Sequence, residues 1–288
     1  MFPKRYSAAS SALVHLTTHV FSMKLSCLEQ IMSQRPTLSS DTLQQADLTT
    51  INKAISALHS TATSVVAVYL LNCSSWPIPS IPAHRPHRNV DTKSPPDDSL
   101  NPIINGQNYL ANALTTWETA YLLFDTWFMV YATKKRLGLS SNITALRIVA
   151  KKSPVVLAHH VLLSSAFLYL QSYIIAGKER GLWVITAFIL MNSSSPIMHL
   201  RWWLRRRSGI PSNVMDIAFL ASFAGARFGV VFWILKRYGS YHGLSTAQAC
   251  MALRKQCKIG TAMLIGFNGL WWTILVNKLV GRNIKRWT

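Results

Sequence analysis

Ionisable and strongly polar side chains lie inside stretches of this sequence that are otherwise apolar. Glu118 and Asp125 are seven residues apart, so at 100° per residue both carboxylates lie on one face of a helix. His160 shares a helix face with Ser164 and Gln171 by the same geometry. An ionisable group in the hydrocarbon layer of a membrane costs about 3 kcal/mol on insertion scales, and it therefore turns toward a partner or a cavity. The two faces predict an enclosed polar site or a proton relay.

Other apolar stretches carry similar polar faces. Asn192 and His199 are seven residues apart, and Arg227 follows Asp216 by eleven, which again places each pair on one face. We expect these faces either to line one buried cavity or to form separate hydrogen bonds that only join helices. The residues predicted to line a polar cavity or a lipid site are His59, Glu118, Asn192, His199, Arg201 and Arg227.

The neighbouring histidines His159 and His160 cannot both face the same atom, because adjacent residues on a helix point about 100° apart. One is expected to face the interior and the other a neighbouring helix. No third ligand stands at a known metal-binding spacing, and the four cysteines form no Cys-x-x-Cys pair. The sequence therefore predicts no metal site.

The composition indicates which elements must position these residues. The chain has 288 residues, of which 50% are hydrophobic and 14% charged, with a formal net charge of +20. Soluble domains carry about 25% charged residues. The apolar residues gather in blocks of about 20, the length of a membrane-spanning helix. This pattern excludes a soluble enzyme, a secreted disulfide scaffold and a nucleic-acid-binding domain, and it predicts an all-α membrane protein with several spans.

The apolar blocks predict a bundle of six or seven transmembrane helices. The stretch 7–26 is a weaker seventh candidate, either a span or an interfacial helix within an N-terminal segment 1–50. The Pro-rich stretch 76–104 is expected to be an exposed loop, and 283–288 a basic tail. The six predicted spans are 54–75, 109–132, 153–175, 182–200, 213–235 and 260–280.

Lysines and arginines lie mostly between the predicted spans. One side of the membrane receives more of them than the other, which by the positive-inside rule places the C-terminus in the cytoplasm. Basic loops next to spans attract anionic headgroups, so the expected partners are membrane lipids and not nucleic acid. Homo- and hetero-oligomers in the membrane both remain open.

Several short motifs in order resemble the TLC domain. They are the segment 55–60 around His59, the segment 120–125 that ends in Asp125, the His159–His160 pair, the segments 192–196 and 199–202, and Arg227. The resemblance covers the predicted transmembrane domain, 51–282. It implies a bundle of six or seven helices that encloses a cavity for lipid chains.

The resemblance also implies two functions. In ceramide synthases the histidine pair and nearby acids serve N-acylation of a sphingoid base by acyl-coenzyme A, which makes His159, His160 and Asp125 the catalytic candidates and acyl-coenzyme A a co-substrate, with no bound cofactor. This chain has no carboxylate from Val161 to Tyr173, and Asn192 stands where related proteins often have Glu. These departures favour the branch of the family that is not a ceramide synthase.

Three hypotheses follow. The first is a TLC-type protein that binds or senses lipid and contributes to membrane-lipid homeostasis. The second is a ceramide-synthase-like N-acyltransferase, and the third is an ion- or proton-coupled transporter that uses Glu118, Asp125 and Arg227 as a relay. The endoplasmic reticulum is the expected location, with the plasma membrane and a mitochondrial membrane as alternatives.

Overall fold

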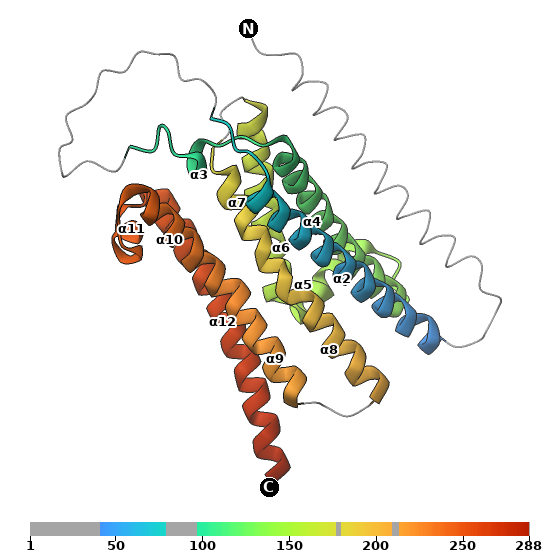
Figure 1. Ribbon diagram of the computed structural model, residues 1–288. Coiled ribbons are helices and arrows are strands. Elements are labelled where there is room, and N and C mark those ends of the chain that lie inside the picture. Colours follow the sequence, from blue (N-terminus) through green and yellow to red (C-terminus); the bar gives the residue numbers. More distant parts are fainter. Residues whose placement is uncertain (1–40, 79–96, 177–179, 209–212, 288) are drawn as a thin grey trace. The chain divides into compact units, whose positions relative to one another are not determined.

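The computed structural model of the chain describes residues 41–78, 97–176, 180–208 and 213–287 (Figure 1). Every regular element among these residues is a helix, which confirms the predicted all-α membrane fold. The chain divides into two compact units, one of residues 1–55 and 112–178 and the other of residues 56–111 and 179–288. The predicted seventh span, 7–26, lies outside the described residues.

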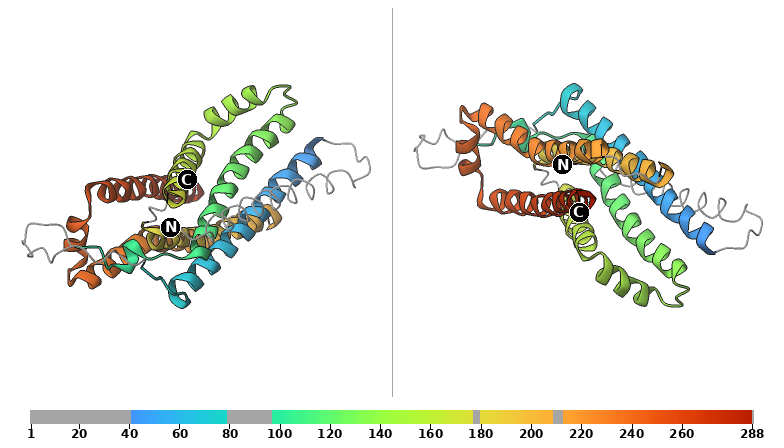
Figure 2. Two further views of the ribbon diagram at one scale, coloured as in Figure 1. Left: turned by 90° about the horizontal axis from the view of Figure 1, so that it is seen from above. Right: turned by 90° about the horizontal axis from the view of Figure 1, so that it is seen from below.

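The first unit consists of the start of α2 (Asp41–Cys73), most of α4 (Tyr109–Arg136), α5 (Asn142–Lys152) and α6 (Pro154–Ile175). Figure 2 shows α4 running out to a turn from which α5 and α6 return. Gly138 makes the turn with φ +60°, a conformation that costs glycine little. The Ser141 hydroxyl accepts a hydrogen bond from the Ile143 amide and begins α5, and Pro154 begins α6.

Aromatic residues of α4 form the apolar core of the first unit. Phe124 and Phe128 are buried with Leu48 of α2, and Ile51 and Ile55 of α2 pack against them. The two phenylalanine rings are 6.0 Å apart and tilted by 38°, an arrangement favoured by aromatic pairs. Because this core occupies one face of α4, the polar face of the same helix is turned toward other neighbours.

The second unit contains the rest of α2 and the remaining helices. Its core joins Ile103 of α3, Trp183 and Ala187 of α7, and Ile234 of α10. α12 packs against α9 and η2. The elements are α3 (Pro102–Asn105), α7 (Leu182–Ile189), the 3-10 helix η1 (Leu190–Ser194), α8 (Ser195–Ser208), α9 (Asn213–Ala224), the π-helical turn η2 (Gly225–Gly229), α10 (Val230–His242), α11 (Thr246–Ala252) and α12 (Lys255–Trp287).

Within the described residues, four helices are long and apolar enough to cross a membrane. They cover Leu48–Cys73, Pro154–Ile174, Asn213–His242 and Lys255–Gly281, and each overlaps a predicted span. α4 is 28 residues long and coincides with the predicted span 109–132, but it is not among the four. Its polar face, which includes Glu118 and Asp125, lowers its mean hydropathy.

The predicted span 182–200 is helical throughout, but it is not one regular α-helix. The chain passes from α7 into the 3-10 helix η1 and then into α8, which continues to Ser208. Pro196 follows this irregular turn, and proline has no amide hydrogen to continue the α-helical pattern. The Ser194 hydroxyl also donates to the Met191 carbonyl at 3.3 Å, a local bond that competes with helix formation.

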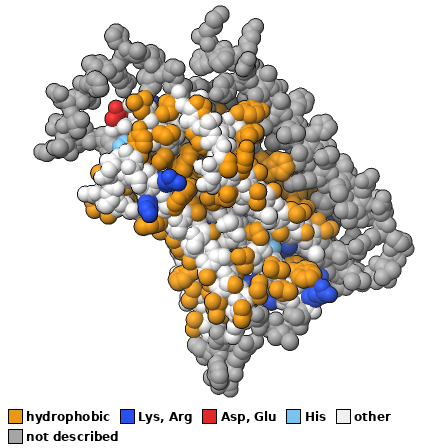
Figure 3. Space-filling view, in the orientation of Figure 1, with side chains coloured by type: hydrophobic (Ala, Val, Ile, Leu, Met, Phe, Trp, Pro, Cys, Tyr) orange, Lys and Arg blue, Asp and Glu red, His pale blue; other side chains and the backbone are white. Residues whose placement is uncertain are grey.

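Large apolar side chains are exposed along these helices. Leu58 is 72% exposed and Val214 74%. Hydrophobic side chains are spread over the described surface seen in Figure 3, with few Lys or Arg residues among them. A soluble monomer rarely exposes large continuous apolar patches, whereas a membrane protein presents such a surface to lipid chains.

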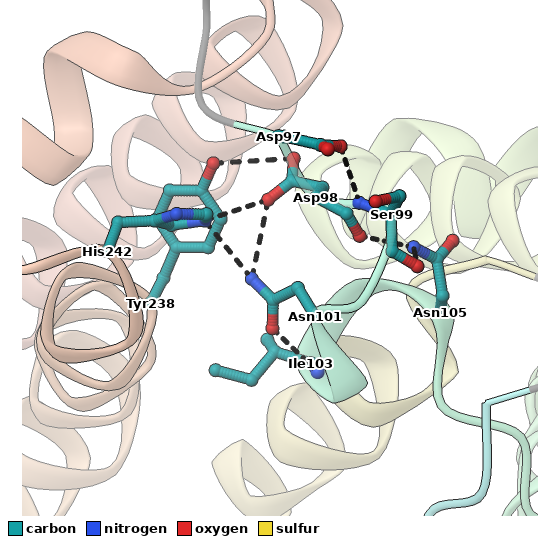
Figure 4. Close-up of polar contacts among 8 residues, drawn as sticks. All are labelled: Asp97, Asp98, Ser99, Asn101, Ile103, Asn105, Tyr238 and His242. Carbon is teal, nitrogen blue, oxygen red and sulfur yellow. Dashed lines mark hydrogen bonds and ion pairs between the residues drawn. The ribbon is translucent and has the colours of Figure 1, made fainter. Parts of the chain in front are cut away.

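The end of the Pro-rich stretch 76–104 is packed, so the prediction of an exposed loop is wrong for this part. Asn101 is fully buried, and its amide nitrogen lies 3.3 Å from both Asp98 Oδ1 and His242 Nε2. His242 Nε2 is 3.0 Å from the same carboxylate oxygen, and the Tyr238 hydroxyl donates to Asp98 Oδ2 at 3.4 Å (Figure 4). These bonds attach residues 98–101 to the end of α10.

We expect Asn101→Ala to lower the free energy of unfolding by about 2 kcal/mol. The change removes the side-chain oxygen that accepts from the Ile103 amide at the start of α3, and it leaves Asp98 with fewer donors. Unfolding in detergent followed by circular dichroism measures the effect. Leu100→Ala is the control, since Leu100 is exposed; equal losses in both variants would contradict the proposed contribution.

Candidate functional site

A polar face on α4 carries the candidate site. Asn112, Thr115 and Glu118 follow one another at helical spacing, and Asp125 continues the face two turns later. Glu118 is buried, and the Asp125 side chain is 15% exposed. Glu118 and Asp125 therefore lie on one continuous helix, as predicted, and both carboxylates are largely inaccessible from outside the protein.

Asp125 and Thr126 both contact His160 of α6. The Asp125 Oδ2 atom lies 3.5 Å from His160 Nε2, an ion-pair distance, and the Thr126 hydroxyl lies 3.0 Å from His160 Nδ1. The two contacts use both nitrogens of the imidazole ring and so hold its orientation. A carboxylate, an imidazole and a hydroxyl are thus joined in a row within one helix pair.

The direction in which the Thr126 hydroxyl hydrogen points depends on whether His160 is protonated. Thr126 Oγ1 is 2.8 Å from the Leu122 carbonyl, so its proton has two acceptors to choose between, that carbonyl and His160 Nδ1. When the Thr126 proton points to Nδ1, neutral His160 carries its own proton on Nε2, the atom 3.5 Å from the Asp125 carboxylate. When His160 is protonated at both nitrogens, Thr126 accepts from Nδ1 and turns its own proton to Leu122. By rotating, the Thr126 hydroxyl can therefore accommodate either protonation state of His160.

Lys53 of α2 adds a positive charge near this row. It lies close enough to Asp125 for a charge–charge interaction, and it is half-buried. Asp125 Oδ1 is buried and has no hydrogen-bond partner among the described residues. An ionised carboxylate in such a place is stabilised by its cationic neighbours and keeps one oxygen able to accept a further donor.

A second set of hydrogen bonds joins α4 to α6. The Gln171 amide nitrogen donates to Asn112 Oδ1 at 3.2 Å and to the Thr115 hydroxyl at 2.8 Å. Gln171 lies eleven residues after His160, and Thr115 eleven residues before Thr126, so the two helices are antiparallel and in register over three turns. The predicted common face of His160 and Gln171 is confirmed.

His159 and His160 have different surroundings, as their spacing predicts. His160 is buried, whereas His159 is half-buried. The ring centroids are 5.9 Å apart and the rings are tilted by 50°. The structure thus brings His160 to Asp125 and gives His159 a separate environment. Among the described residues, no group of three His, Cys, Asp or Glu side chains could hold a metal ion.

The other predicted site residues belong to the second unit. His59 on α2 and His199 on α8 are buried, and Asn192 lies in η1, where the helix is irregular. Arg227 lies in the π-helical turn η2, with its guanidinium 5.4 Å from the centre of the Phe223 ring. π-Helical turns are rare and are often found at functional sites. We therefore retain Arg227 as a candidate ligand for a polar group.

Arg201 forms a buried ion cluster with a residue outside the predicted set. Arg201 Nε and Arg205 Nη2 both donate to Asp216 Oδ1, and Asp216 is 2% exposed. Asp216 lies in the first turn of α9, where the helix dipole favours a negative charge. Arg227 follows Asp216 by eleven residues, about 16 Å along a helix, which is too far for a direct pair. Because Arg227 lies in the π-helical turn, the regular 100° repeat on which the predicted shared face rests does not extend to it.

Sequence analysis missed two residues of the candidate site. Lys53 was placed just outside the predicted span 54–75, but the apolar part of α2 begins at Leu48. Thr126 is next to Asp125 but carries no charge, and threonines are frequent on this helix. Its position beside the imidazole depends on the register of α4 against α6, and the spacing of residues within one helix does not determine that register.

The described helices and their apolar surface define the class of protein, an all-α integral membrane protein with polar groups buried between helices. Residues 50–277 match the family of the TLC domain. The match covers most of the chain, so the chain belongs to this family, as the ordered motifs predict. Comparison with curated proteins and with solved structures finds no match.

We expect Asp125 and His160 to be energetically coupled. Asp125→Asn and His160→Gln each remove the titratable group of one member, and in a double-mutant cycle the coupling free energy should be about 1–2 kcal/mol. The free energy of unfolding in mixed detergent micelles measures it. Asp125→Asn combined with Gln171→Leu is the control, since three helical turns separate the two contacts and additivity within about 0.5 kcal/mol is expected. Additive effects of Asp125→Asn and His160→Gln would contradict the pair.

We expect Asp216→Asn to lower the free energy of unfolding by about 3 kcal/mol, because it leaves two guanidinium groups without their shared countercharge. The same unfolding measurement applies. Asp97→Asn is the matched control: Asp97 is exposed and accepts a local hydrogen bond from the Ser99 amide. A change below about 0.5 kcal/mol for Asp216→Asn, the range of surface substitutions, would show that the cluster contributes little.

Proposed function

We propose that this TLC-domain protein binds lipid within its transmembrane domain and contributes to membrane-lipid homeostasis. The observation that carries the proposal is the row Asp125–His160–Thr126, in which His160 is buried and the other two are half-buried, in helices whose other faces are apolar and exposed. Molecules that reach a polar site through such a surface are the lipids around it. Membrane lipids are accordingly the proposed partners, and the site needs no bound cofactor for recognition.

The chemistry of the row suits a lipid with a polar group near its chains. Lipid hydroxyl or amine groups can donate to Asp125 Oδ1 or exchange a proton with His160. A buried polar site discriminates strongly between ligands that satisfy its hydrogen bonds and ligands that do not. The site can therefore respond to the type of lipid present, which is the property that a homeostatic protein requires.

The contact between Asp125 and His160 also favours a second candidate function, a ceramide-synthase-like N-acyltransferase. In that reaction His160 would take the proton from a sphingoid amine as the nitrogen attacks the thioester carbon of acyl-coenzyme A. The amide bond forms, the carbon–sulfur bond breaks, and the proton passes to the thiolate. Asp125 would orient the imidazole and stabilise its protonated form.

We further propose the endoplasmic reticulum as the location, with the C-terminus in the cytoplasm. The support is the distribution of lysine and arginine between the predicted spans. The absence of carboxylates on the stripe after His160 supports placement in the non-synthase branch of the family.

The test is lipid analysis in cells that lack the protein and are complemented with variants. We expect wild type to restore the phospholipid acyl composition, and His160→Gln and Asp125→Asn to fail at equal membrane abundance, because each removes the proton-exchanging pair. Gln171→Leu is the matched control: it breaks contacts between the same two helices without removing a titratable group, and it should restore the composition.

Two outcomes separate the hypotheses. Purified protein given a sphingoid base and acyl-coenzyme A should form no amide if it only binds lipid; amide formation that is lost in His160→Gln would establish the acyltransferase instead. If His160→Gln and Gln171→Leu restore the composition equally, the row has only a structural role and the proposal is wrong.

A further inference from the structure

A groove of about 750 Å³ lies along the C-terminal half of α4, within the first unit. One wall is α4, and the other is the turn after it and the start of α5. The lining is mostly apolar and includes two aromatic side chains. The residues that line it are Leu123, Thr126, Trp127, Val130, Tyr131, Lys134, Lys135, Gly138, Leu139, Asn142 and Leu146.

The middle of the groove suits a hydrocarbon chain. Trp127 and Tyr131 are stacked with ring centroids 5.2 Å apart and planes 16° apart, which gives a flat, rigid wall. Trp127, Leu123 and Leu146 line the groove and are themselves exposed. The groove is therefore accessible from the side on which lipid chains surround the helices, and a bilayer lipid can enter it without leaving the membrane.

One end of the groove is positively charged. Lys134 and Lys135 lie in the last turn of α4, and the Lys135 ammonium is 5.9 Å from the centre of the Tyr131 ring. The helix that follows, α5, is amphipathic: Ile143 and Leu146 are exposed on it, and Lys151 and Lys152 end it. Amphipathic basic helices of this kind lie in the membrane interface, at the level of the headgroups.

The other end of the groove reaches the candidate site. Thr126 lines the groove and its hydroxyl contacts His160, which in turn contacts Asp125. Eight residues of helix, about 12 Å, separate Thr126 from Lys134. A lipid whose headgroup is at the lysines would therefore extend its upper acyl chain, with the ester groups, along the stacked rings toward Thr126.

We propose that this groove binds an anionic phospholipid of the surrounding bilayer, with an acyl chain against Trp127 and Tyr131 and its phosphate at the end where Lys134 and Lys135 both line the groove, since their long flexible side chains can turn toward one group. The proposal rests on the proposed lipid-binding function and identifies the ligand class and its entry to the Asp125–His160–Thr126 row. The two lysines are complementary in charge to a phosphate. Because the walls of the groove are apolar and exposed, they favour a phosphate that belongs to a lipid of the bilayer over one dissolved in water.

Native mass spectrometry of protein released from nanodiscs tests the proposal. The discs contain equal amounts of phosphatidylglycerol and phosphatidylcholine. Wild type should retain phosphatidylglycerol about tenfold more than phosphatidylcholine, and Lys134→Gln/Lys135→Gln should reduce this ratio to near one. The matched control is Lys255→Gln/Lys258→Gln, which removes two exposed lysines from the start of α12 and should keep the wild-type ratio.

Each other outcome has a defined meaning. Equal loss in the control pair would assign the preference to general surface charge, and no preference in wild type would exclude the site; both overturn the proposal. Displacement of the phospholipid by micromolar acyl-coenzyme A would identify a different occupant and overturn the bilayer source. If the nanodisc experiment shows no lysine-dependent preference but His160→Gln still fails to restore the cellular lipid composition, this groove is excluded and the proposed function stands. If the nanodisc experiment is positive but His160→Gln restores the composition as wild type does, only the proposed function is rejected.

Discussion

The high cost of a charge in an apolar layer is the constraint on which this structure depends. A carboxylate cannot remain ionised there without cations and donors, so Asp125 lies beside Lys53 and His160, and Asp216 beside two arginines. Each cluster joins neighbouring helices by polar contacts, which matter in a membrane because apolar surfaces gain little by leaving lipid for one another. The polar side chains that lower the mean hydropathy of α4 thus also give this helix specific partners.

α4 shows how one helix combines these roles. Its aromatic face packs on α2, its polar face bonds to α6 at two levels, and its C-terminal half forms a wall of the groove. Thr126 belongs both to the groove and to the Asp125–His160–Thr126 row. A molecule in the groove would therefore be in contact with the hydroxyl that lies against His160 Nδ1.

The second unit uses buried polar groups to a different end. Asp98, Asn101 and His242 fasten the segment before α3 to the end of α10, and Asp216 fastens α9 to α8. These groups lie toward the ends of helices, where the backbone also offers unpaired donors and acceptors. Their arrangement is typical of structural attachment, whereas the row on α4 and α6 leaves the Oδ1 atom of Asp125 open to a further donor.

The amino-acid sequence alone determined which segments are helical and apolar, and which polar residues share a helix face, because hydropathy and a 100° repeat are properties of one segment. It therefore predicted the family, most of the helices and the pairing of His160 with Gln171 on one stripe. Only the tertiary structure decided which stripes meet: Thr126 and Lys53 at the site, Arg205 on Asp216, and the packing of residues 98–101. These contacts depend on the register of one helix against another, and many registers are compatible with the same periodicity.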